Sequence, residues 1–110
     1  MIYTKNNPKL IESIYYFENK ETFSGVVKDQ YGDIAYYLNG KFHRENGPAT
    51  ECATGGKRWC LNGKYHREDG PAIQYASGLR HWYLNGVYYG FNNDFTNESW
   101  TKFVKLQLLK

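Results

Sequence analysis

The chain has 110 residues, with 14 basic and 11 acidic side chains and a formal net charge of +3. This length fits a single domain, residues 1–110, and the mild charge without a Lys/Arg cluster argues against a long nucleic acid as partner. No apolar run approaches the roughly 20 residues that span a bilayer, and the N-terminus lacks a signal-peptide pattern, so we expect a cytoplasmic protein with no membrane segment. The 11 tyrosines, six phenylalanines and three tryptophans favour a twisted β-sheet.

Residues 14–31 are predicted to form a degenerate first unit of a repeat. Segments 15–20 and 25–32 weakly resemble the later segments 36–41 and 47–55. Terminal units of a repeat array lack one neighbour, so an atypical first unit is expected. Residues 8–17 are ambiguous, because Pro8 could open a helix, although a strand from about Ile11 onward is the preferred interpretation.

Residues 32–91 contain the repeat itself, with a period of 23 residues. LNGKFHRENGPA at 38–49 returns as LNGKYHREDGPA at 61–72 with two changes, and an eroded copy, LNGVYYG, begins at position 84. Asn-Gly between apolar residues is the strongest short-range hairpin signal, because both residues tolerate the positive φ of a type I′ turn. The predicted turn residues are Asn39, Gly40, Asn62, Gly63, Asn85 and Gly86. The predicted strands are 48–53, 57–61, 64–66, 71–76 and 80–84.

The His-Arg-Glu triplet inside the repeat admits two interpretations. As acid/base groups, His43 and His66 could serve a nuclease or phosphodiesterase. As structural groups, the histidines could donate to a backbone carbonyl of a neighbouring unit, and Arg44 and Arg67 could stack on a tryptophan of an adjacent unit, namely Trp59 or Trp82. The last unit has Tyr89 and Gly90 at these positions and no unit after it. A docking role predicts this loss and a catalytic role does not, so we expect no enzyme.

Other site chemistries have no support in the spacing of residues. The three histidines and two cysteines lack the C-x-x-C or H-E-x-x-H patterns of metal sites. No phosphate-binding loop or nucleophile elbow occurs. Cys52 and Cys60 are expected to be free thiols packed in a sheet. We therefore expect no catalytic residue, no metal and no cofactor.

Residues 95–110 are predicted to form a short amphipathic helix that caps the array. Thr96 or Asn97 can cap its start, and an apolar face follows at helical spacing, formed by Trp100, Phe103, Val104 and Leu108. This face is expected to cover the last hairpin, whose open edge would otherwise favour aggregation. Alternatively, Trp100 and Phe103 contribute to a face that binds a partner.

The repeat resembles the MORN repeat, and more closely the variant W-Y-x-N-G-K-x-H-R-x-D-G-P-A found in phage and giant-virus proteins. The resemblance covers residues 32–91 well and 14–31 weakly. It departs from the ordinary MORN pattern at Arg44 and Arg67, where glycine usually follows the histidine. The resemblance implies a mainly β chain, an array of antiparallel hairpins used as a binding surface, and no catalytic residues.

Three functions are compatible with these features. The preferred one is a non-catalytic protein-binding module, by resemblance a phage or viral accessory protein that inhibits a host defence component in the host cytoplasm. The alternatives are a nucleotide or nucleic-acid binder and a structural component such as a virion protein, and open sheet edges make a homodimer credible. The candidate partner-binding residues are Lys57, Arg58, Arg80, His81, Trp100 and Phe103.

Overall fold

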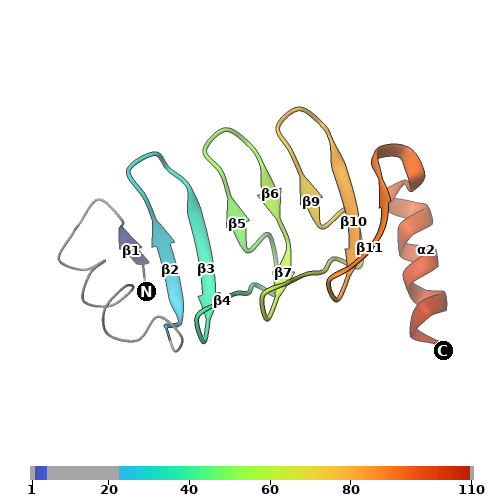
Figure 1. The fold of residues 1–110 in the computed structure, drawn as a ribbon, viewed down its shortest axis with the longest axis horizontal. Coiled ribbons are helices and arrows are strands. Elements are labelled where there is room, and N and C mark those ends of the chain that lie inside the picture. The colour runs from blue at the N-terminus through green and yellow to red at the C-terminus, as the bar shows by residue number, and fades with distance from the viewer. Residues whose placement is uncertain (1, 5–22, 110) are drawn as a thin grey trace.

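The computed structural model describes residues 2–4 and 23–109, which form a sheet with a helix at its C-terminal end (Figure 1). The strands follow one another in the order β1-β2-β3-β5-β6-β9-β10-β11, and β4 pairs with β3. These strands are β1 (Ile2–Thr4), β2 (Gly25–Lys28), β3 (Ile34–Leu38), β4 (Lys41–Phe42), β5 (Thr50–Glu51), β6 (Lys57–Arg58), β9 (Ile73–Gln74), β10 (Arg80–Leu84) and β11 (Val87–Phe91). A separate two-stranded sheet contains β7 (Cys60–Leu61) and β8 (Lys64–Tyr65).

The described part of the chain is mainly β, with antiparallel strands and one α-helix near the C-terminus, and this much of the predicted fold is confirmed. Strand β1 is the exception, because it runs parallel to β2. The hairpins stand side by side along the long axis of a slab that measures 47 × 31 × 18 Å (Figure 1). The predictions for residues 8–17 and for the first half of the degenerate unit, 14–22, fall outside the described residues.

The three Asn-Gly turns adopt the backbone conformation that their sequence requires. Asn39, Asn62 and Asn85 have φ values of 51°, 50° and 48°, and the glycine after each also has a positive φ. Several strands are shorter than predicted. β5 and β9 begin only after Pro48 and Pro71, because proline offers no N–H to a strand partner.

Large and small side chains alternate across one face of the sheet, in what we call the aromatic row. The row runs from Tyr36 through Ala49, Trp59 and Ala72 to Trp82, and the backbone N–H groups of Tyr36 and Trp59 donate to the carbonyls of Ala49 and Ala72. Both alanines are fully buried. A methyl group fits between two large rings, so the alternation packs neighbouring strands closely.

Helix α2 spans Asn97–Leu108 and stands beside β11 at the end of the array (Figure 1). It begins two residues later than predicted, because a 3₁₀ turn, η3 (Asn92–Asp94), precedes it and Thr96 caps it by accepting from the N–H of Ser99. Trp100 and Val104 are buried against Trp82. Leu108 was predicted on the same face but is 71% exposed. Among the described residues, no helix has the length and apolar character that crossing a bilayer demands.

The two cysteines are free and lie in different environments, which gives a first prediction. Cys52 is exposed, whereas Cys60 is buried, and burial raises the pKa of the Cys60 thiol to about 11, against a smaller opposing effect of Arg58. An alkylating agent at neutral pH is expected to modify Cys52 in the folded protein and Cys60 only after unfolding, as measured by mass spectrometry of the intact chain.

The matched control is Cys52→Ser, which should leave the folded protein unlabelled. Equal labelling of both thiols in the folded protein would contradict the burial of Cys60. The raised pKa also has a consequence for stability. The contribution of the neutral Cys60 thiol to the free energy of unfolding is fully present below pH 9.0, the ordinary pKa of a thiol. It is lost as the pH rises from there toward about 11, because the thiol ionises in the unfolded chain first.

Candidate functional site

Each Asn-Gly turn is fastened to the hairpin before it by two hydrogen bonds, which we call the turn latch. In the latch of the last hairpin, the N–H of Asn85 donates to Nδ1 of His66 over 3.0 Å. The N–H of Gly86 donates to the carbonyl of Tyr65 over 2.9 Å. The imidazole therefore accepts a bond from the next hairpin, and the prediction that it donates to a carbonyl was wrong.

The latch recurs between the preceding hairpins. The N–H of Asn62 donates to Nδ1 of His43 over 2.9 Å. At the start of the array, the hydroxyl of Ser24 takes the place of the imidazole and accepts from the N–H of Asn39 over 2.9 Å. A serine fulfils the same role, so the role demands an acceptor atom and not acid/base chemistry.

The second ring nitrogen of each histidine faces a carboxylate. Nε2 of His66 lies 3.0 Å from Glu68, and Nε2 of His43 lies 3.8 Å from Glu45. The two imidazoles are only 11% and 15% exposed. A general base needs a free nitrogen within reach of its substrate. In both rings Nδ1 accepts from a backbone N–H, and in His66 the second nitrogen also lies within hydrogen-bond distance of a carboxylate, so His66 presents no free nitrogen.

The two arginines fold back over their own hairpins. The guanidinium of Arg67 lies 3.8 Å from the ring of Trp59 and donates to Asp69 (2.9 Å) and to the carbonyl of Pro71 (3.1 Å). Arg44 lies 4.0 Å from the ring of Tyr36 in the same manner. The prediction of stacking on an adjacent unit was therefore wrong, because the loop after the histidine returns across the strand that precedes its own turn.

Two glycines leave room for these guanidinium groups, which gives a second prediction. A Cβ atom on Gly70 would lie 2.7 Å from Cζ of Arg67, and one on Gly47 would lie 3.0 Å from Cζ of Arg44. Gly70→Ala is expected to lower the free energy of unfolding by about 1–3 kcal/mol, because the stack must open. Gly47→Ala is the matched control and should cost less in the same urea titration. An equal or reversed order would contradict this packing.

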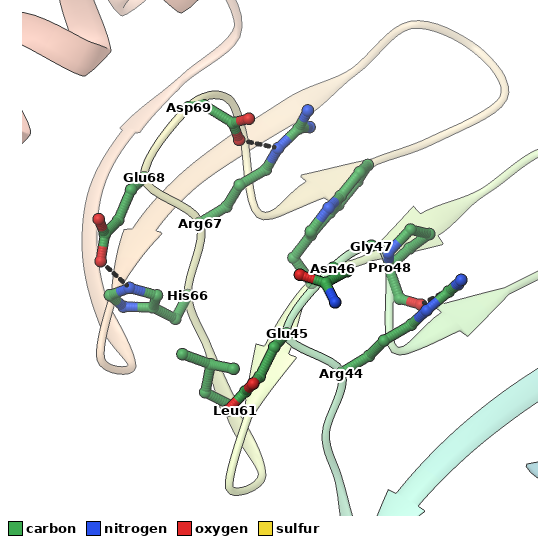
Figure 2. Close-up of a pocket in the computed structure, with 11 residues that line it drawn as sticks. Arg44, Glu45, Asn46, Gly47, Pro48, Leu61, His66, Arg67, Glu68 and Asp69 are labelled. Carbon is green, nitrogen blue, oxygen red and sulfur yellow. Dashed lines mark hydrogen bonds and ion pairs between the residues drawn. The ribbon is translucent and has the colours of Figure 1, made fainter.

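Between the two arginine-bearing loops lies a cavity of about 740 Å³, which we call the inter-hairpin groove (Figure 2). It is lined by Arg44, Glu45, Asn46, Gly47, Pro48, Trp59, Leu61, His66, Arg67, Glu68 and Asp69. Trp59 and Leu61 supply apolar surface. Three exposed carboxylates stand around it, those of Glu45, Glu68 and Asp69, with side-chain exposures of 77%, 56% and 80%.

The four basic residues proposed to bind a partner do not form one surface. Lys57 and Arg80 both pair with Gln74 of β9, which lies between their strands. Arg58 and His81 both pair with the neighbouring Ile73. Neighbouring residues of a strand point to opposite faces, so Lys57 and Arg80 lie on the face of the aromatic row and the other two lie behind it. Arg80 donates to the side chain of Asn93 over 2.6 Å.

The two aromatic residues proposed to bind a partner pack inside the molecule instead. Trp100 is fully buried, and its indole Nε1 donates to the carbonyl of Arg67 over 2.7 Å. Phe103 is half-buried against Trp100, Phe95 and Tyr89. Trp100 therefore presents no surface to a partner, whereas the ring of Phe103 stays partly exposed.

Two further features were missed in the sequence. On the face behind the aromatic row, His81 packs against the rings of Tyr75, Tyr88 and Phe91, and its Nδ1 is buried without a hydrogen-bond partner among the described residues. A second cavity of about 350 Å³ contains Lys57 and Arg80 in its lining. The alternation of side chains along each strand could have shown that His81 lies on the other face from Arg80. The second cavity could not be predicted, because turns from different units come together to form it.

Residues 2–4 and 23–109 contain no group of three or more His, Cys, Asp or Glu side chains placed to hold a metal ion. Comparisons with protein-family models, with curated proteins and with solved structures gave no match.

Proposed function

We propose that this chain is a non-catalytic protein-binding module, built as an array of MORN-like hairpin units, and that the inter-hairpin groove receives part of its protein partner. The observation that carries the proposal is the groove itself, which is large, open and lined by both apolar and charged side chains. Buried apolar surface with a polar rim is the usual anatomy of a protein interface. The use of Nδ1 of both histidines as an acceptor for the next turn, and the contact of Nε2 of His66 with Glu68, support binding over catalysis.

The biological setting that we propose rests on the resemblance of the repeat to those of phage and giant-virus proteins. In this setting the chain is an accessory protein that acts in the cytoplasm of the host and blocks a component of host defence. Such a protein needs a rigid surface and no chemistry of its own. The array offers this, because each Asn-Gly turn is hydrogen-bonded to the segment before it.

The test is affinity capture from a host lysate with a pair of matched variants. Asn46→Trp places a large ring in the lining of the groove, and Gln30→Trp places the same ring at an exposed turn elsewhere. The expected result is a stoichiometric protein that the wild type and Gln30→Trp recover and Asn46→Trp loses. A partner held equally by both variants would exclude the groove, and the recovery of no partner would count against a binding module.

The second cavity favours one alternative, a small nucleotide or similar anion. Lys57 and Arg80 provide two positive charges there, and Tyr75 and the turn glycines Gly55 and Gly78 also line the cavity. Absorbance at 260 nm on the purified protein would indicate a bound base. Titration with ATP should then show binding that Lys57→Ala weakens, whereas the absence of both signals would dismiss this alternative.

A further inference from the structure

We infer that the inter-hairpin groove is built like the site that holds α2, and that it takes an amphipathic helix from a partner, with an aromatic anchor and basic flanks. This inference rests on the proposed function, because it names the class of partner for the same groove.

Four residues of the repeat contribute to the seat of α2, together with Phe95, whose ring lies 4.8 Å from that of Trp100. The ring of Trp100 lies 5.4 Å from that of Trp82 and 5.9 Å from that of Tyr89, and its indole N–H donates to the carbonyl of Arg67. Leu84 packs against the same cluster. The helix therefore docks by one buried aromatic side chain, anchored both by ring contacts and by a hydrogen bond to a loop carbonyl.

The residues 23 positions before these four are Arg44, Trp59, Leu61 and His66, and all four line the groove. The groove thus has a loop carbonyl, an indole, a leucine and a further ring in the order found at the seat of α2. The carbonyl oxygen of Arg44 has no donor among residues 2–4 and 23–109, whereas the equivalent oxygen of Arg67 accepts from Trp100. An N–H or O–H group on an aromatic side chain of the partner can donate to the carbonyl oxygen of Arg44.

One difference determines how deeply a helix can enter. At the seat of α2, Gly90 places no side chain on Trp82, and the rings of Trp100 and Phe95 pack against that indole instead. In the groove, the equivalent residue is Arg67, which already covers Trp59. A partner's aromatic side chain would therefore lie beside this stack, against Leu61. The partner's helix would then lie farther from the sheet than α2 does.

The charge around the groove selects a basic helix. Three carboxylates, those of Glu45, Glu68 and Asp69, outnumber the two arginines around the groove. Glu68 contacts His66 and Asp69 accepts from Arg67, but the three acidic side chains are 77%, 56% and 80% exposed, whereas both guanidinium groups are stacked on rings. α2 itself shows the matching chemistry, with exposed Lys102 and Lys105 next to its aromatic face. Charge complementarity of this kind speeds association and fixes orientation.

The probe that tests the inference is a labelled synthetic peptide of residues 95–110, added to the full-length protein and followed by fluorescence anisotropy. We expect saturable binding that Asn46→Trp weakens at least about tenfold and Gln30→Trp leaves unchanged. A peptide with the Trp100→Ala change should bind at least about tenfold more weakly, and added salt should weaken the binding of the unchanged peptide.

Two outcomes would overturn the inference. Undiminished binding to Asn46→Trp means that the peptide displaces α2 from its own seat, and no binding at all means that the groove does not take such a helix. The lysate capture separates this failure from that of the proposed function. If a partner is lost with Asn46→Trp while the peptide fails to bind, the groove binds a protein of other chemistry, and only the present inference falls.

Discussion

Replacement of Trp100 by alanine is expected to lower the free energy of unfolding by about 3–5 kcal/mol, the range for deleting a fully buried tryptophan. Trp100 has no exposed surface and contacts the rings of Trp82, Phe95, Tyr89 and Phe103. The substitution leaves a cavity beside Trp82 and removes the donor to the carbonyl of Arg67. The measurement is urea unfolding followed by circular dichroism.

Two variants control for this experiment. Trp100→Phe keeps a ring in the core and loses only the indole, so it should cost less than Trp100→Ala. Leu108→Ala, on the same helix at a side chain that is 71% exposed, should change stability little. If Trp100→Ala costs no more than Leu108→Ala, α2 does not hold the end of the array.

Replacement of His66 by alanine is expected to lower the free energy of unfolding by about 1–3 kcal/mol, because the N–H of Asn85 loses its acceptor and the loss of an imidazole that is only 11% exposed leaves unfilled space. The loss of the contact with Glu68 adds to this cost. His43→Ala should act in the same direction through Asn62. Thermal unfolding of each variant gives the measurement.

The informative comparison is His66→Asn, since the side-chain oxygen of asparagine can take the position of Nδ1. This variant should recover much of the stability that His66→Ala loses, whereas Glu68→Gln should cost little. A full loss of stability in His66→Asn would show that the ring, and not the acceptor atom, holds the turn. Loss of partner binding in His66→Ala at unchanged stability would contradict the structural role of the histidine.

The sequence was sufficient to predict the features that depend on local chemistry. The positive φ values of Asn39, Asn62 and Asn85 follow from the Asn-Gly pairs, and the start of α2 follows from the capping chemistry of Thr96. Asparagine, glycine and threonine favour particular backbone conformations, so these residues indicate a turn or a helix start from the local sequence alone. Turns and helix ends could therefore be predicted without knowledge of the sheet.

The features that failed depend on which segments meet in space. The sequence names Arg67 and two candidate tryptophans, but only the path of the loop decides that the guanidinium lies on Trp59 of its own hairpin. Likewise, the helical spacing of Trp100 does not reveal that Trp82 will cover it. The groove was not predicted at all, because two loops from different units form it.

The latches and stacks have a further consequence, for the length of the molecule. On one side, each middle hairpin has backbone N–H groups that donate to the preceding hairpin. On its other side it has a histidine nitrogen and a carbonyl oxygen that accept from the next hairpin. A duplicated 23-residue segment inserted between existing units would thus meet complementary groups at both junctions. Each insertion would also add one more groove between arginine-bearing loops, so the number of grooves can grow in whole steps without redesign of either end.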